Sequence, residues 1–270
     1  PRPKIFRAAL RLAQLFSPLQ AYLPTNISSL LALAPKNLPP PSRVDRPQII
    51  AAEGSRHMRV ALLSGCAQTV LDTKINEATI RVLTRFGVEV VIAKGMGCCG
   101  AVAHHLGKVD HSRQLALKNI KAWKREIDDA GLDYIVVNAS GCGTTIKDYK
   151  FLFRDDPEIQ EIAADISRRT VDICEIISKL DYKKSFQASK LRVAYHSACS
   201  LQHGQKIIEE PRDLLERAGF EVMSVPEGHI CCGSAGTYNL LQPELSQQLL
   251  RRKIANINSL DPDIIACLLY

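Results

Sequence analysis

Seven of the nine cysteines fall into two sets with the same spacing, in which one cysteine precedes an adjacent Cys-Cys-Gly by 32 residues. The first set is Cys66, Cys98 and Cys99, followed by Cys142, and the second is Cys199, Cys231 and Cys232. Adjacent cysteines are poorly placed to bridge each other, because a disulfide needs Cα atoms about 4.4–6.8 Å apart. Two neighbouring thiolates on a turn can instead face one metal centre. Soft thiolates select iron–sulfur clusters or zinc.

The elements around the two sets follow the same order of strand and helix. We expect strands at 59–65, 88–93 and 134–138 and helices at 72–86, 108–130 and within 155–180 in the first half, then strands at 192–195, 220–225 and 263–266 and helices at 205–218 and 243–258. Alternating strands and helices indicate parallel sheets, whose carboxyl edge binds ligands. The pattern predicts an α/β fold of two pseudo-symmetric repeats, each a small, mostly parallel sheet with flanking helices.

This pattern divides the chain into a helical connector with a Pro-rich linker (1–57), a first repeat (58–185) and a truncated second repeat (186–270). Residues 2–33 have a basic amphipathic pattern, which Pro18 and Pro24 divide into short helices. A helix of this kind can dock on a partner or a membrane surface. We prefer the interpretation that it packs on the rest of the fold, and we expect residues 42–57 to be polar and irregular.

The cysteines follow strand ends, so we expect Cys66, Cys98, Cys99 and Cys142 to converge as a four-thiolate site. The second set lacks a counterpart of Cys142, because that position falls beyond Tyr270, and Cys267 lies inside the third strand. We expect the second half to be poorer in metal and less stable, with apolar surface exposed in its last strand. That surface would comprise Ile264, Ile265 and Leu268.

Several other residues could contribute to such sites. His196 or His229 could complete the second set, but we prefer to interpret both as surface residues. His104 and His105 could tune or ligate a cluster, although a polar helix start explains them slightly better. Cys174 lies in an apolar helical stretch and is predicted to be a core residue.

Composition excludes several function classes. The net charge of +7 comes from scattered basic residues, with no basic stripe that would favour nucleic-acid binding. No signal peptide and no apolar run of about 18 residues is present, so we expect a cytoplasmic chain without a transmembrane segment. Motifs of hydrolases, dinucleotide-binding and nucleotide-hydrolysing proteins are missing as well. The chain begins with Pro1, which predicts that an upstream part is absent.

The doubled Cys-x31-Cys-Cys-Gly pattern resembles the cysteine-rich CCG domain. This domain occurs in subunits of heterodisulfide reductase and of anaerobic glycerol-3-phosphate dehydrogenase, in lactate-utilisation proteins and in the glycolate oxidase iron–sulfur subunit. The segments 94–105, 138–144, 195–199 and 231–238 look most like the last of these. The resemblance covers residues 58–266 and, weakly, 2–33.

The resemblance implies an electron-transfer subunit of a glycolate dehydrogenase with clusters of the [4Fe–4S] type, held by the seven cysteines of the two sets. Flavin-bearing partner subunits would oxidise glycolate to glyoxylate, and electrons would pass towards a quinone, with the chain peripheral on the inner face of the plasma membrane. Two alternatives stay open: a related oxidoreductase subunit for lactate or glycerol 3-phosphate, and a structural zinc module.

Two departures from the family pattern stand out. The ferredoxin-like module with two Cys-x-x-Cys-x-x-Cys-x-x-x-Cys-Pro runs does not occur in this sequence, so it must lie upstream of Pro1 or be lost. Thr145 stands where the first repeat of the family ends in a further cysteine. This substitution argues against a five-thiolate noncubane cluster.

Overall fold

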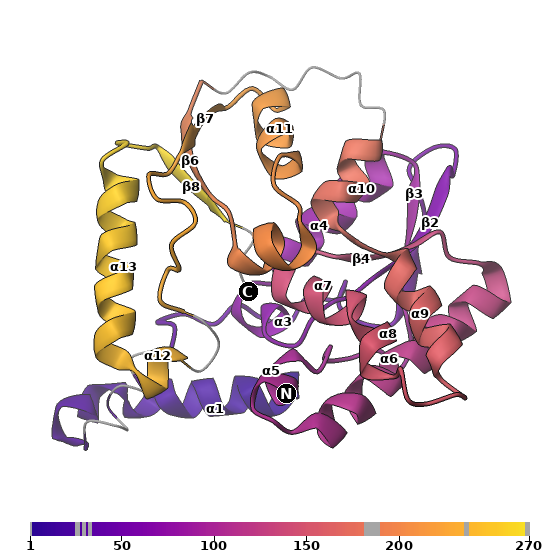
Figure 1. The fold of residues 1–270 in the computed structure, drawn as a ribbon, viewed down its shortest axis with the longest axis horizontal. Coiled ribbons are helices and arrows are strands. Elements are labelled where there is room, and N and C mark those ends of the chain that lie inside the picture. Colours follow the sequence, from indigo (N-terminus) through magenta and orange to yellow (C-terminus); the bar gives the residue numbers. More distant parts are fainter. Residues whose placement is uncertain are drawn as a thin grey trace.

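The computed structural model describes residues 2–24, 28, 31, 34–180, 190–234 and 238–267. Within these residues the chain forms two β-sheets with flanking helices, and an N-terminal helical segment lies along one side of the molecule (Figure 1). None of the helices described has the length and apolar character needed to cross a bilayer.

The first sheet has five strands in the order β1-β3-β2-β4-β5. They are β1 (Gln48–Ile50), β2 (Met58–Leu62), β3 (Val88–Ile92), β4 (Tyr134–Val137) and β5 (Thr170–Asp172). Strands β2 to β5 run parallel, and β1 pairs antiparallel with β3 at the edge. The central strands are mostly apolar, as expected for parallel strands covered on both faces, and each of β2 and β3 carries one charged residue near its start, Arg59 and Glu89.

Helices connect these strands and cover both faces of the sheet (Figure 1). They are α3 (Gln68–Leu71), α4 (Lys74–Arg85), α5 (Ala101–His105), α6 (Val109–Ala130), α7 (Ser140–Lys147), α8 (Tyr149–Leu152), α9 (Gln160–Arg169) and α10 (Ile173–Lys179). Two large apolar clusters result: one is centred on Trp123 and Tyr149, the other on Leu83 and Ile176.

The second sheet has three parallel strands in the order β7-β6-β8. Its elements are β6 (Arg192–His196), a π-helical turn η2 (Ser200–Gln205), α11 (Glu210–Arg217), β7 (Glu221–Ser224), α12 (Tyr238–Leu241), α13 (Pro243–Asn258) and β8 (Ile264–Cys267). Its apolar clusters are small, and the main one contains Ala194, Val225 and Ile257 with Leu260 packed against them. Ile264 and Ile265 are 40% and 54% exposed, as predicted, whereas Leu268 lies outside the described residues.

The two sheets confirm the predicted duplication. Strands β3-β2-β4 of the first sheet and β7-β6-β8 of the second have the same order and direction. A matching contact joins the first and third strands of each repeat. Asp133 Oδ2 accepts from the backbone N–H of Arg59 at 2.7 Å, and Asp263 Oδ2 accepts from that of Arg192 at 2.7 Å.

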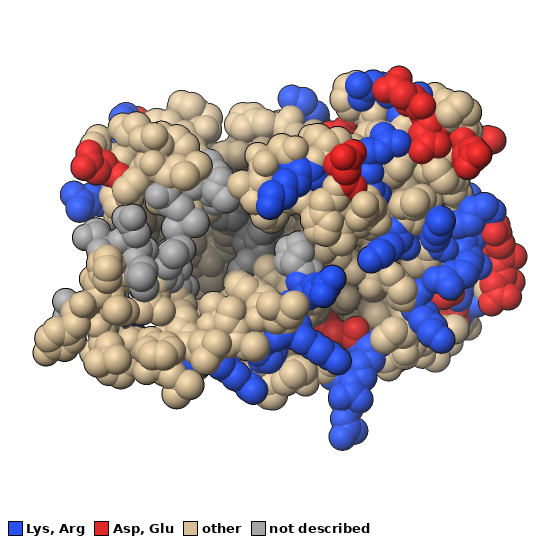
Figure 2. Space-filling view, turned by 90° about the horizontal axis from the view of Figure 1, so that it is seen from below, with Lys and Arg blue, Asp and Glu red and all other residues tan. Residues whose placement is uncertain are grey.

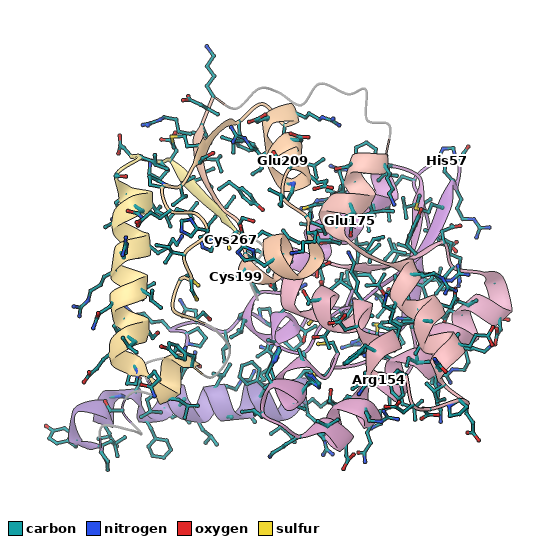
Figure 3. All side chains as sticks on the ribbon, viewed as in Figure 1. His57, Arg154, Glu175, Cys199, Glu209 and Cys267 are labelled. Carbon is teal, nitrogen blue, oxygen red and sulfur yellow. The ribbon has the colours of Figure 1, made fainter. Side chains whose placement is uncertain are left out.

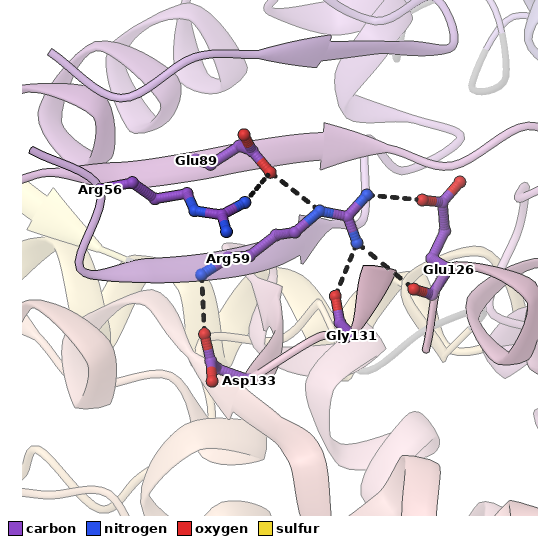
Figure 4. A network of polar contacts seen from close by, with 6 residues as sticks. All are labelled: Arg56, Arg59, Glu89, Glu126, Gly131 and Asp133. Atoms are coloured by element: carbon purple, nitrogen blue, oxygen red, sulfur yellow. Dashed lines mark hydrogen bonds and ion pairs between the residues drawn. The ribbon is translucent and has the colours of Figure 1, made fainter. Parts of the chain in front are cut away.

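The arginine of this contact is embedded differently in the two repeats. Arg59 is 6% exposed and pairs with Glu89 at 2.8 Å and Glu126 at 2.9 Å (Figure 4). The equivalent Arg192 is 39% exposed and pairs with Asp261 at 3.4 Å. Buried, multiply hydrogen-bonded ion pairs fix geometry more firmly than exposed ones. The amino ends of the first sheet are therefore joined by a buried ion-pair network, and those of the second by a more exposed arginine that bonds to the Asp261 and Leu260 carbonyls.

Three sequence predictions for individual elements were wrong. Residues 48–50 form edge strand β1, because their backbone completes the β3 ladder. Residues 170–172 form β5 beside β4, inside a stretch predicted to be helical. The helix predicted at 205–218 begins only at Glu210, after the π-helical turn.

The N-terminal segment is divided as predicted. Helix α1 (Pro3–Phe16) passes into the 3-10 helix η1 (Ser17–Tyr22) just before Pro18. Most of residues 25–33 lie outside the described part of the chain, so the prediction there has no structural counterpart.

Candidate metal centre: two cysteine clusters

The structure brings the four cysteines of the first set together at the carboxyl edge of the first sheet. Cys66 follows β2, Cys98 and Cys99 follow β3, and Cys142 lies in helix α7 directly after β4. The Sγ atoms of Cys66 and Cys98 are 3.6 Å apart, and those of Cys99 and Cys142 are 3.2 Å apart. Two bonds of about 2.3 Å at a tetrahedral centre place their sulfurs about 3.8 Å apart. Each of these two pairs is therefore spaced like two ligands of one metal ion.

Hydrogen bonds among these thiols set their protonation. Cys66 donates to the Cys98 sulfur, Cys99 donates to Cys142 and also lies beside Cys98, and Gly100 N–H approaches the Cys98 sulfur at 3.4 Å. These contacts lower the pKa of Cys98 to about 2. The same hydrogen bond to Cys98 raises the pKa of Cys66, and hydrogen bonds to Cys142 and Cys98 together with burial raise the pKa of Cys99. Metal binding would displace the protons that Cys66 and Cys99 keep in this arrangement.

The glycine after each cysteine pair turns the chain in the same way in both repeats. Gly100 and Gly233 have φ of +93° and +89°, a region that residues with a Cβ rarely adopt. Each carbonyl accepts a hydrogen bond from a serine on the following long helix, at 3.1 Å from Ser112 and 2.8 Å from Ser246. Neither serine was predicted to contribute. The sequence feature that could have identified both is their shared position, early in the long helix that follows each Cys-Cys-Gly.

A buried polar frame holds the first cysteine pair in place. Asn119, fully buried on α6, accepts from Gly97 N–H at 2.7 Å and donates to the Cys98 carbonyl at 3.0 Å. The buried Tyr149 hydroxyl donates to the Cys99 carbonyl at 2.8 Å. Such hydrogen bonds position backbone that would otherwise lose solvation on burial. Asn119 and Tyr149 were not predicted, because nothing in a lone asparagine or tyrosine marks it as a loop support.

The three cysteines of the second set also approach one another. Burial, the neighbouring Cys231 and Cys232, and a hydrogen bond between the Cys199 and Cys231 thiols raise the pKa of Cys199. Gly233 N–H lies 3.4 Å from the Cys231 sulfur, as Gly100 N–H does from Cys98. The cysteines of this set are only partly buried, whereas Cys98 and Cys99 are buried.

A lysine takes the place of Asn119 in the second repeat. Lys253 follows Ser246 by seven residues, as Asn119 follows Ser112. Its side chain is 3% exposed, and Nζ donates to the carbonyl of Glu227 at 2.9 Å and to that of Gly228 at 3.4 Å. The second loop is thus held by a buried cation, where the first is held by a neutral amide.

The histidines do not join the cysteine sets as ligands in this structure. His196 is 6% exposed, contrary to the prediction of a surface residue, and its Nδ1 lies 3.2 Å from the sulfur of Cys267. Figure 3 shows Cys267 and Cys199 near the middle of the molecule, on β8 and just after β6. His229 is exposed, as predicted.

His104 and His105 begin a surface groove beside the first cluster. Both are exposed on α5, and they line a groove of about 740 Å³ together with Gly141 and Thr145 of α7. Thr145 Oγ1 donates to the Gly141 carbonyl at 3.0 Å, so its side chain is used within its own helix. Cys174, by contrast, is 7% exposed in the second apolar cluster, as predicted for a core cysteine.

Polar contacts join the two cysteine sets across the boundary between the repeats. Ser140 Oγ lies 2.7 Å from Ser200 Oγ, and Thr144 Oγ1 donates to the Ser200 carbonyl at 3.0 Å. Gln205 Nε2 donates to the Ser140 carbonyl at 2.9 Å. These residues flank Cys142 on one side and Cys199 on the other, so the two sets sit on facing elements.

The donor set suits a sulfur-ligated metal group. Among the described residues, no group of three or more His, Cys, Asp or Glu side chains has the spacing needed to hold a metal ion. The first cluster nevertheless offers four soft donors, one of them approached by the Gly100 N–H, on loops that Asn119 and Tyr149 support. Thiolates of this kind select iron–sulfur clusters or zinc over hard cations.

Comparison with known proteins agrees with the duplicated site. The model of the cysteine-rich CCG domain matches twice, at residues 60–147 and 193–267. The chain is 37% identical to the protein named glycolate oxidase iron-sulfur subunit of Escherichia coli K12, over 98% of this chain and 62% of that protein. It is 30% identical to the "Probable glycolate oxidase iron-sulfur subunit" of Bacillus subtilis 168, over 96% of this chain and 58% of the other.

A third relative has a different name. Lactate utilization protein A of Geobacillus thermodenitrificans is 28% identical, over 77% of this chain and 85% of that protein. The chain therefore spans about 60% of the length of the first two relatives and most of the third. The two matched segments, each with its sheet and its cysteine set, show that the chain belongs to the family of cysteine-rich CCG domain proteins.

Proposed function

We propose that this chain is the iron–sulfur electron-transfer part of a glycolate-oxidising complex. The observation that carries the proposal is the convergence of four thiols from three strand ends, with sulfurs 3.2 Å and 3.6 Å apart in two pairs. The identity of 37% to the Escherichia coli protein named glycolate oxidase iron-sulfur subunit supports glycolate as the substrate of the whole complex.

The first four cysteines would hold the cluster, and Cys199, Cys231 and Cys232 would hold a second group with fewer protein ligands. An iron–sulfur cluster supplies one-electron transfer between a donor and an acceptor. The residues of this chain contribute binding and orientation: Asn119 and Tyr149 fix the Cys98-Cys99 backbone, and the glycine N–H groups stabilise thiolate charge. Hydrogen bonds to the sulfurs and solvent exposure tune the potential of such a cluster.

Substrate oxidation itself belongs to partner subunits in this proposal. The described residues offer sulfur ligands and no hydride-accepting group, and hydride chemistry is carried by cofactors such as flavin. Flavin-bearing subunits would deliver electrons to the cysteine clusters. The chain would pass them on towards a quinone, which places it at a membrane surface on the cytoplasmic side.

The lactate alternative has a specific observation in its favour, since relatives named lactate utilization protein A match this chain over 77% of its length at 28% and 27% identity. A related oxidoreductase that uses lactate is thus the second candidate. A structural zinc module is the remaining alternative, because four thiolates also suit Zn²⁺.

Anaerobic purification followed by analysis of iron, acid-labile sulfide and zinc tests the proposal. We expect iron and sulfide in near-equal amounts with an EPR signal on reduction. Stoichiometric zinc without sulfide would overturn it in favour of the structural module. Rapid-mixing reduction by the purified flavin partners with glycolate or lactate then separates the two substrates, because the correct one reduces the clusters faster.

A further inference from the structure

Helix α1 faces the protein with a mixed side, on which Arg7 and Gln14 stand beside the half-buried Phe6, Leu10 and Ala13. Arg7 is 9% exposed, and its guanidinium donates to the carbonyl of Thr69 at 3.0 Å and to that of Pro39. About two turns further on, Gln14 Nε2 donates to the Pro35 carbonyl at 2.7 Å. Helices at the surface of a globular protein usually bury their apolar stripe. In α1, polar hydrogen bonds also fasten the helix to the Pro-rich segment and α3.

An apolar stripe of α1 nevertheless points away from the fold. Its large side chains recur at helical spacing and continue into η1, with exposed fractions between 50% and 85%. They are Ile5, Leu12, Leu15, Phe16, Leu19 and Tyr22. Scattered exposed apolar residues are ordinary, but a contiguous stripe of six indicates a surface that contacts an apolar partner.

Charge indicates what that partner is. The first 44 residues contain six Lys or Arg and no Asp or Glu. Lys4 and Arg11 are exposed on α1, adjacent to the apolar stripe in the helical projection. Figure 2 views the molecule from the side of α1 and shows tan surface with blue basic groups beside it. An apolar stripe with basic residues along its border, in a segment without acidic residues, is complementary to an anionic lipid surface.

We propose that α1 and η1 bind an anionic phospholipid bilayer, with the helix axis in the plane of the membrane. The apolar stripe would enter the boundary between headgroups and acyl chains, and Lys4 and Arg11 would reach the lipid phosphates. Aromatic residues such as Phe16 and Tyr22 suit this interfacial depth. This inference rests on the proposed delivery of electrons towards a membrane acceptor and extends it, since it names the surface that would hold the chain there.

Co-sedimentation with extruded vesicles tests the inference on the full chain after anaerobic purification. We expect binding to vesicles of equal phosphatidylglycerol and phosphatidylcholine and at least tenfold weaker partition into pure phosphatidylcholine. The double variant L12E/L15E should lose most binding to the anionic vesicles. The matched control L191E/I208E changes two side chains exposed by 41% and 53% outside the N-terminal segment, and it should bind like the unmodified chain.

The variant K4A/R11A tests the electrostatic contribution to membrane binding separately from the apolar contribution. It should weaken anionic binding by roughly tenfold or more, because each basic group near an anionic surface contributes a several-fold factor in affinity. No partition into anionic vesicles, or equal loss in the control, would overturn the inference. The inference would also be overturned if L12E/L15E still bound the vesicles and α1 captured a purified flavin partner. The apolar stripe would then be a protein-binding surface. Iron and sulfide content, measured on the same samples, reports separately on the proposed clusters.

Discussion

Ser140 and Ser200 lie 60 residues apart in the chain, yet their hydroxyl oxygens are 2.7 Å apart. Ser140 precedes Cys142 by two residues, and Ser200 directly follows Cys199. The contact therefore ties the helix that carries the last cysteine of the first set to the turn that begins the second. The space there is tight, because a Cβ on Gly204 would lie 2.9 Å from the Thr144 side chain. The two repeats are packed through their cysteine-bearing elements.

Replacing Cys98 by Ser should remove most of the metal held by the first cluster. Cys98 accepts the hydrogen bond of the Cys66 thiol and is approached by Cys99 and by Gly100 N–H, so its loss removes the sulfur that these groups surround. C174S is the matched control, because Cys174 is buried in the apolar core and should retain normal metal content. Iron and sulfide analysis measures both variants. C231S should remove less metal than C98S, and equal losses would show that the second site has a ligand besides its three thiols.

Replacing Gly100 by Ala should destabilise the first cysteine loop. Gly100 has φ of +93°, and a Cβ there would lie 2.8 Å from Ser112 Oγ and 3.1 Å from the Ser112 carbonyl. Strain of this kind costs about 1–3 kcal/mol. Gly97, three residues earlier, has nothing within 4 Å of the position that a Cβ would take, so G97A is the control. The midpoint of urea unfolding should fall for G100A and stay near the original value for G97A.

Replacing Asn119 by Leu should weaken both the fold and the cluster. The substitution leaves Gly97 N–H and the Cys98 carbonyl without their buried partner, which costs about 1–3 kcal/mol for each unsatisfied group. Gln114 is exposed on the same helix, so Q114L is an amide-to-leucine control. Urea unfolding and iron retention under mild chelation are the measurements. Unchanged iron retention in N119L would mean that the loop holds its geometry without this frame.

Asp172 should make the stability of the first repeat depend on pH. Its carboxyl is fully buried, and desolvation raises its pKa to about 6 from 3.8. The folded state then binds more protons than the unfolded state between these values, so the contribution of Asp172 to stability is present below about 3.8 and is lost as pH rises through about 6. The full effect is roughly 3 kcal/mol.

The variant D172N removes this titration and keeps an acceptor for the N–H of Cys174, which the aspartate caps at 2.9 Å. The stability of D172N relative to the unmodified chain should therefore increase between pH 4 and 6.5. D155N, at an 81% exposed carboxyl, is the control and should show no such trend. A flat difference for D172N across this range would contradict the raised pKa.

The repeated spacing of the cysteines was enough to predict which thiols approach one another, and their role as metal ligands stays a prediction. Because cysteines follow strand ends and parallel strands share a carboxyl edge, the sequence predicted the convergence of Cys66, Cys98, Cys99 and Cys142 and the duplicated strand order. Helix α13 has the predicted bounds, and α6 begins one residue later than predicted, since their apolar periodicity is long and regular. Strands β1 and β5 were missed because three-residue strands have too little pattern and depend on a partner ladder.

Tertiary structure alone decided how the loops are supported and which way the surfaces face. Asn119, Tyr149 and Lys253 reach the cysteine loops from distant elements, and no local pattern reveals a contact made by folding. The periodicity of α1 predicted an amphipathic helix, but periodicity does not show which face of the helix is buried. The hydrogen bonds of Arg7 and Gln14 to distant carbonyls fix the orientation of the helix, and the apolar stripe that begins at Ile5 is left exposed.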